Sequence, residues 1–165
     1  MTRTFTQKYT IVQFVDDVAE GYEFTPENWS LHVTIVDTFA IDWSVNEMVA
    51  ELTDALQHYK PASSAAQNDS YFGENKQVCV TLLNRSKSLL GLHLDVLGVL
   101  EKGGLALNDP QFAGSGFRPH ATVQKHARLH KGNEVKFAAL SIVNMFPGNN
   151  PHRRKVLKTI QLGNA

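Results

Sequence analysis

The chain has 165 residues, of which 42% are hydrophobic and 19% charged, as in an ordinary soluble globular protein. This length suits one domain and can bury a core without disulfides or metal ions, so we expect a single domain over residues 1–165. The only cysteine, Cys79, excludes a disulfide within the chain and favours a reducing compartment. No stretch approaches the roughly 18 apolar residues of a membrane span. The N-terminus also lacks the apolar segment of a secretory signal, so a cytoplasmic protein without membrane association is predicted.

The net charge is zero, but the charges are unevenly distributed. From Gln111 to the C-terminus, Glu134 is the only acidic residue, and it is accompanied by nine lysines and arginines. Such an asymmetry favours contact with an anion, for example a phosphate or a nucleic acid. Attraction between this basic third and the acidic remainder of the chain is an equally good reading of the charge alone.

The first half of the chain predicts two strands and a helix. Residues 8–15 and 30–39 are rich in β-branched and aromatic residues and predict strands, with a loop over 20–29 between them. Ser44 is a candidate cap for a helix over 45–59, which Pro61 ends. The polar residues 61–69 then predict a linker.

The second half predicts strands on both sides of another helix. Residues 71–84 contain two strands joined by a turn at 73–75, and Ser86 can cap a helix that ends at Gly103 and Gly104. Three further strands are expected over 118–126, 134–146 and 155–163. Runs of strands interrupted by two helices favour an α+β fold with mostly antiparallel sheets. Because each half carries one helix and one similar motif, we expect two pseudo-symmetric lobes around a central cleft, with the helices outside.

The similar motif is a histidine and a threonine two positions apart in a strand. It occurs in "LHVTIV" (31–36) and again in "PHATVQ" (119–124). Because side chains alternate along a strand, His32 and Thr34 share one face, and His120 and Thr122 repeat the arrangement. By chance, two matches of this pattern are expected in only about one in 100 chains of this composition. The repeat therefore indicates one site built from both halves.

Two histidines facing one cleft suit the cleavage of a phosphodiester without a metal ion. A neutral imidazole can take a proton from the attacking water, and an imidazolium can give a proton to the leaving oxygen. Threonine hydroxyls and nearby cations can bind the phosphate oxygens. Zinc held by the two histidines with Asp37 or His126 is the competing interpretation. Threonine is a poor zinc ligand and the chain has no H-E-x-x-H or C-x-x-C motif, so no metal or cofactor is expected.

At these motifs the sequence resembles the two-histidine (2H) phosphoesterases, which include the 2′–5′ RNA ligase-like proteins and cyclic nucleotide phosphodiesterases. The segments "PENWSLHVTI", "YFGENKQVCVTL" and "GFRPHATVQK" are similar to the family's motif contexts. The resemblance implies a bilobed fold with a central cleft and a catalytic set of His32, Thr34, His120 and Thr122. The chain departs from many members because no glycine follows Phe39 and Lys125 stands where arginine is common. These departures leave the subfamily and its substrate open.

Several other side chains are candidates for substrate binding. Tyr71, Phe72 and Phe39 are candidates for stacking on a base, and Arg118 and Lys125 are candidates for contacting the phosphate. Strict alternation would place Lys125 on the strand face opposite His120, which argues against it unless a bulge intervenes. The remaining histidines are expected to be structural or exposed: His58, His93, His126, His130 and His152.

The sequence thus predicts a metal-independent phosphoesterase that hydrolyses 2′,3′-cyclic phosphates or 2′–5′ linkages of RNA ends or small nucleotides. The alternatives are an RNA- or nucleotide-binding module with little turnover, and a 2′–5′ RNA ligase that runs the same chemistry in reverse. The two motifs are so alike that the sequence does not assign the acid and the base. No obligate protein partner is evident.

Overall fold

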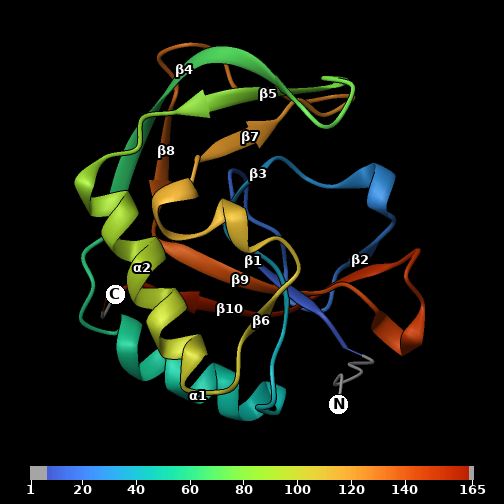
Figure 1. Cartoon of the computed structure of the whole chain (residues 1–165), viewed down its shortest axis with the longest axis vertical. Coiled ribbons are helices and arrows are strands. Elements are labelled where there is room, and N and C mark those ends of the chain that lie inside the picture. The colour runs from blue at the N-terminus through green and yellow to red at the C-terminus, as the bar shows by residue number, and fades with distance from the viewer. Residues whose placement is uncertain (1–6, 164–165) are drawn as a thin grey trace.

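The computed structural model describes residues 7–163, which form two antiparallel sheets and two α-helices (Figure 1). The six-stranded sheet has the order β2 (Glu23–Phe24), β10 (Arg154–Gln161), β9 (Ala139–Asn144), β1 (Tyr9–Phe14), β3 (His32–Ala40) and β6 (Ala106–Leu107). The four-stranded sheet has the order β7 (His120–Thr122), β5 (Val78–Leu83), β4 (Ala62–Phe72) and β8 (Glu134–Phe137). The predicted α+β class with antiparallel sheets is confirmed, and the two motif strands belong to different sheets.

The two helices begin at the predicted capping serines. In α1 (Val45–Leu56), the Ser44 hydroxyl accepts a hydrogen bond from the backbone N–H of Glu47, whose carboxylate accepts the Ser44 N–H in return. This reciprocal pair satisfies two of the backbone donors that a helix start leaves free. In α2 (Lys87–Glu101), the Ser86 hydroxyl accepts from the N–H of Leu89. Four short 3-10 turns complete the regular structure: Pro26–Asn28, Pro110–Phe112, Gly114–Gly116 and Pro147–Asn149.

Apolar side chains cover both faces of the six-stranded sheet. The larger core joins one face to α1, α2 and the four-stranded sheet. A smaller cluster occupies the other face and includes Val12 and Phe14 of β1. His32 pairs with Phe14 and Thr34 with Val12 across β1 and β3. Because directly paired residues point to the same side of a sheet, the first motif lies on the face of the smaller cluster, away from the helices.

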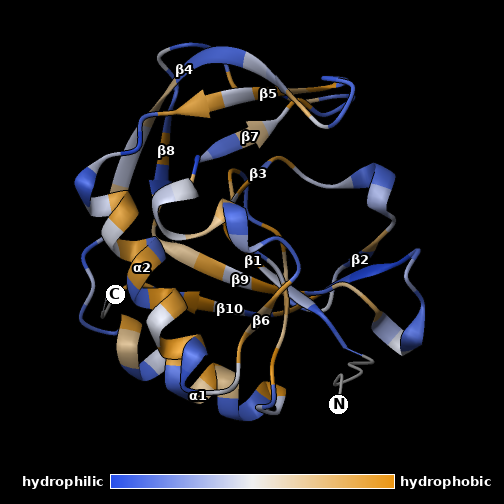
Figure 2. Cartoon of the chain, in the orientation of Figure 1, coloured by the Kyte–Doolittle hydropathy of each residue, from blue (hydrophilic) through white to orange (hydrophobic). Residues whose placement is uncertain are grey.

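The predicted linker over residues 61–69 is wrong, because these residues belong to the long strand β4. The strand is bonded on both sides, to β8 through residues 62–65 and to β5 through residues 66–72. Figure 2 shows β4 mainly in hydrophilic colours, in contrast to the hydrophobic β9. β4 has no β-branched residue and most of its apolar residues are alanines, so it lacks the alternation that marks a strand in sequence. Its extended conformation is explained by the pairing with its two neighbours.

The single strand predicted over residues 134–146 is two strands, one in each sheet. β8 ends at Phe137 and β9 begins at Ala139, so the chain changes sheets at Ala138. The buried side chain of Gln13 supports this corner, because its Oε1 accepts the N–H groups of both Ala138 and Ala139. A buried amide from a strand distant in sequence thus satisfies two backbone donors at the break.

The basic third of the chain is partly paired with acidic residues from the earlier part. Arg153 and Lys158 form exposed ion pairs with Glu23 and Glu20 at 3.7 and 3.6 Å. Attraction between the two parts of the chain, which was one of the two interpretations of the charge asymmetry, therefore applies to some of the basic residues. Exposed pairs of this kind contribute little to stability.

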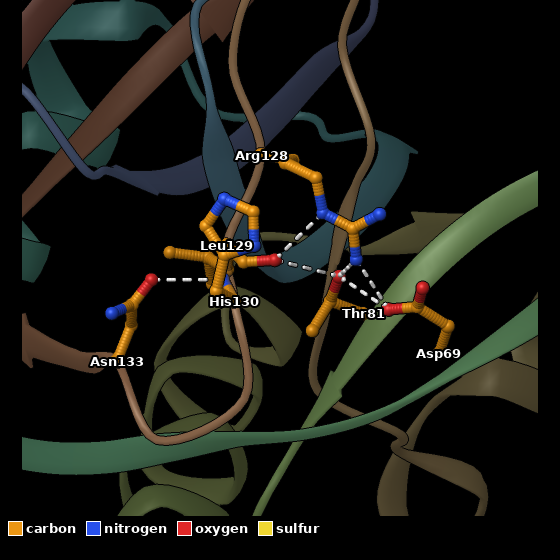
Figure 3. Close-up of polar contacts among 6 residues, drawn as sticks. All are labelled: Asp69, Thr81, Arg128, Leu129, His130 and Asn133. Atoms are coloured by element: carbon orange, nitrogen blue, oxygen red, sulfur yellow. Dashed lines mark hydrogen bonds and ion pairs between the residues drawn. The ribbon is translucent and has the colours of Figure 1, made fainter.

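A polar network fastens the segment that follows the second motif to the four-stranded sheet (Figure 3). The guanidinium of Arg128 donates to Asp69 Oδ1 at 2.6 Å and, through Nε, to the carbonyl of Leu129 at 3.0 Å. The buried hydroxyl of Thr81 donates to the same Asp69 oxygen. The hydrogen bond from Arg128 lowers the pKa of Asp69. The backbone N–H of His130, in the same segment, donates a hydrogen bond to the side-chain oxygen of Asn133.

Within residues 7–163, no helix combines the length and apolar character that a membrane crossing requires.

Candidate active site

The two motif histidines are held in the same way. His32 Nδ1 lies 2.8 Å from the carbonyl of Ser30, and His120 Nδ1 lies 2.7 Å from the carbonyl of Arg118. A carbonyl can only accept, so each Nδ1 carries the proton and donates it to the residue two positions earlier. Each ring therefore presents Nε2 as the nitrogen that can exchange a proton with a substrate. The sequence repeat is thus also a repeat of side-chain geometry.

The two strands that carry the motifs meet although they belong to different sheets. β3 and β7 are in contact, and the charge of His120 acts on the pKa of His32. Thr34, His120 and Thr122 line one cavity of about 530 Å³. His32 is absent from that lining. It lies at the first motif beside Thr34, with its ring 4.4 Å from that of Trp29 and 6.1 Å from that of Phe14.

Burial lowers the pKa of both histidines, but their neighbours differ. The positive charge of His120 lowers the pKa of His32 further, and the hydrogen bond to Ser30 raises it. For His120, the bond to the Arg118 carbonyl and the negative charge of Asp37 raise the pKa, against burial and the charge of Arg118. Only His120 thus has a carboxylate among the causes of its shift.

Two predicted binding residues form one wall of the cavity beside His120. The ring of Phe72 meets the His120 ring edge-on, with centroids 4.7 Å apart. The guanidinium of Arg118 lies over the Phe72 ring, 4.8 Å from its centroid. Tyr71, which is 59% exposed, also lines the cavity. The structure therefore brings Tyr71, Phe72 and Arg118 together with His120, where all three can contact a ligand.

Phe39 is the predicted binding residue that the structure contradicts. Its side chain is 0% exposed and packs against Tyr9 with ring centroids 5.9 Å apart. Phe39 and Tyr9 are paired across β3 and β1. Two register shifts occur between Tyr9 and Val12, and together they offset the pairing of β1 with β3 by two residues. An even offset leaves the direction of the side chains unchanged, so Phe39 points into the same core as Val33. It belongs to the core and has no exposed surface to offer a base.

Lys125 is not brought to the cavity of His120. β7 ends at Thr122, and the exposed Lys125 lines a second hollow of about 820 Å³ together with His126, Arg128 and His130. Strand alternation argued against a phosphate contact by Lys125, and its place in the structure does the same. Of the basic residues predicted to bind phosphate, Arg118 is the one in the cavity of the motifs.

Among the cavity residues that the sequence did not predict to bind a ligand are Asp37, Lys76, Asp109 and Phe112. Phe112 is 53% exposed on the turn Pro110–Phe112, and no periodicity marks an aromatic residue in such a turn. Asp37 had a detectable signal, because it follows the first motif on a predicted strand. From sequence, Asp37 is a candidate only as a zinc ligand. Among residues 7–163, no three His, Cys, Asp or Glu side chains are grouped so that they could hold a metal ion.

The sequence of residues 8–139 matches the model of the 2′-5′ RNA ligase superfamily. The match covers most of the chain, and the chain therefore belongs to this superfamily. The resemblance to the 2H phosphoesterases is confirmed. Among curated proteins, none matches the sequence.

Several solved structures share the fold over nearly the whole chain. A crystal structure described as a phosphoesterase has a TM-score of 0.58 and 12% identity, covering 96% of this chain and 99% of its own. E. coli LigT complexed with 3′-AMP has a TM-score of 0.54 and 13% identity, covering 97% and 100%. LigT in its apo form gives 0.55 and 13%, covering 96% and 98%. At such low identity the likeness is one of fold.

Proposed function

We propose that this protein is a metal-independent phosphoesterase that hydrolyses 2′,3′-cyclic phosphate or 2′–5′ phosphodiester bonds of RNA ends or small nucleotides. The observation that carries the proposal is the paired imidazole arrangement. Each ring is oriented through Nδ1 by a backbone carbonyl, leaving Nε2 for chemistry, and the two strands meet at one cavity. Superfamily membership supports the same reaction class.

The surroundings of the two rings favour His32 as the base and His120 as the acid. Asp37 stabilises the protonated form of His120, whereas the charge of His120 disfavours a proton on His32. In this mechanism, His32 Nε2 takes a proton from water as the water oxygen bonds to phosphorus. The bond from phosphorus to the leaving ribose oxygen breaks, and His120 Nε2 gives that oxygen its proton. Each ring can then return to its starting state by proton exchange.

The cavity offers partners for both parts of a nucleotide. The hydroxyls of Thr34 and Thr122 and the guanidinium of Arg118 can bind the phosphate oxygens. Tyr71 and Phe72 offer aromatic surface on which a base can stack. Solved complexes of LigT with 3′-AMP and with ATP support a nucleotide as the class of ligand.

The proposal is tested by assaying the purified protein against the four 2′,3′-cyclic mononucleotides and a 2′–5′ dinucleotide. We expect turnover of at least one of them, undiminished by EDTA, with water incorporated into the phosphate. Binding without turnover would replace the proposal with the nucleotide-binding module. Adding an RNA with a 5′-hydroxyl to the cyclic phosphate tests the reverse reaction, since joined product would identify a ligase.

The dependence of kcat/KM on pH tests the assignment of acid and base. A bell-shaped profile is expected, with the acidic limb from His32 and the alkaline limb from His120. Because both pKa values are lowered in the free protein, the maximum should lie on the acidic side of the usual histidine pKa of about 6.5. Asp37→Asn removes a charge that raises the pKa of His120, so the alkaline limb should move to lower pH.

The matched control is Asp95→Asn, a change of the same kind on the exposed side of α2. It should leave both limbs in place. If Asp37→Asn instead moved only the acidic limb, the roles of His32 and His120 would be reversed.

A further inference from the structure

His93 is a buried titratable residue that the proposed reaction does not use. It lies on α2 among Leu89, Leu92 and Val96 and is 2% exposed. Sequence alone favours a structural role for a histidine on the apolar face of a helix. A buried imidazole is costly unless its two nitrogens both have partners, so the partners of His93 show what it holds in place.

The contacts of His93 fix its protonation state. Nδ1 lies 2.7 Å from the carbonyl of Ile35, so this nitrogen is the donor. Nε2 accepts the backbone N–H of Gly114 at 3.0 Å, which requires that it carry no proton. The ring is therefore neutral, with its hydrogen on Nδ1. Burial, which lowers the pKa of His93, supports the same state.

The third contact of His93 is a stacked aromatic ring. The Phe117 ring is parallel to the imidazole within 4°, with centroids 4.0 Å apart. Phe117 is itself 4% exposed, so the stack is part of the packed interior. The position of the imidazole is thus fixed by two hydrogen bonds in its plane and by a ring against its face.

The partners of His93 belong to the two motif segments. Ile35 follows Thr34 directly in β3, at the point where the pairing with β1 is irregular. Gly114 and Phe117 lie in the segment that leads into Arg118 and His120. His93 and both segments line the cavity of the candidate site. One side chain on a helix therefore bonds to the backbone of both motif segments, which β-sheet pairing alone does not join.

We propose that His93 is a positioning residue that fixes the distance between the two H-x-T motifs. The inference rests on the proposed function, since it concerns the geometry of that reaction. His93 acts through the backbone at Ile35 and Gly114 and does not touch the substrate's reacting atoms. Displacing a catalytic group by about 1 Å can lower a rate about 100-fold. Loss of the bridge should therefore affect the chemical step more than binding.

Two substitutions separate positioning from core packing. His93→Leu fills the helix face but has neither donor nor acceptor, whereas His93→Gln retains one of each on its amide. We expect His93→Leu to lower kcat about 10- to 100-fold with KM changed less than about 3-fold. His93→Gln should recover most of the lost kcat. His58→Ala, a change at an exposed histidine near the end of α1, is the control.

The assays are run well below the melting temperature of each variant, measured by circular dichroism. Wild-type kcat in His93→Leu would overturn the inference, as would a His93→Gln variant no better than His93→Leu.

A second measurement does not depend on turnover. In ¹⁵N-labelled protein, the imidazole signals of His32 and His120 should shift in His93→Leu and remain in place in His58→Ala. If the wild type cleaves no phosphodiester, the proposed function fails, and these spectra still test the bridge. Unshifted His32 and His120 signals in His93→Leu would overturn the inference by themselves.

Discussion

Replacing His120 by alanine is expected to lower kcat for cyclic phosphate hydrolysis about 10²- to 10⁴-fold, the usual contribution of a general acid or base. The leaving ribose oxygen would then depart without the proton that His120 gives it. His32→Ala should cause a loss of similar size, because the attacking water would keep its proton. Single-turnover rates for each variant provide the measurement.

The matched control is His126→Ala. His126 is exposed and lines the second hollow, in the segment that follows β7, so its removal should leave kcat unchanged. Circular dichroism of His32→Ala and His120→Ala establishes that both variants are folded. Full activity in both folded variants, on every substrate that the wild type cleaves, would end the two-histidine mechanism.

Phe39→Ala is expected to destabilise the protein by about 3–5 kcal/mol, as truncation of a fully buried phenylalanine usually does. The Phe39 side chain is 0% exposed and packs on Tyr9, so its removal leaves a cavity in the larger core. Urea unfolding followed by fluorescence measures the change in the free energy of unfolding. The result separates a core residue from the base-stacking residue that the sequence predicted.

Tyr71→Ala is the counterpart on the rim of the cavity. With 59% of its surface exposed, Tyr71 contributes little to the core, so the free energy of unfolding should change by less than about 1 kcal/mol. Loss of base stacking should weaken nucleotide binding by about 1–3 kcal/mol, measurable by calorimetry. If Phe39→Ala left stability intact while weakening nucleotide binding, the placement of Phe39 in the core would be wrong.

The charge pattern had two interpretations, contact with an anion and attraction to the acidic part of the chain. The structure assigns different basic residues to each. Arg153 and Lys158 pair with acidic residues near the N-terminal end of the described chain, whereas Arg118 lies in the cavity of the motifs. Proximity in sequence to a motif therefore predicted the position of one basic residue and not of the other. Arg118, two residues before His120, lines the cavity. Lys125, five residues after it, does not, because β7 has already ended.

The sequence by itself determined the features that depend on a residue and its near neighbours. The period of two in a strand was enough to place His32 with Thr34, and His120 with Thr122, on a common face. In both strands the histidine and threonine are half-buried and the residue between them is buried. The caps at Ser44 and Ser86 follow from hydrogen bonds that span three residues. The interactions that determine these features are all made within one short segment of the chain.

Tertiary structure alone decided the features that depend on partners distant in sequence. β4 is a strand because β5 and β8 bond to its two edges, and β8 separates from β9 where Gln13 satisfies the backbone. His93 reads in sequence as one more residue on an apolar helix face. Its bonds to Ile35 and Gly114, 58 and 21 residues away, exist only once the sheets and α2 have packed. Periodicity records which face a side chain takes, but it carries no information on what that face will meet.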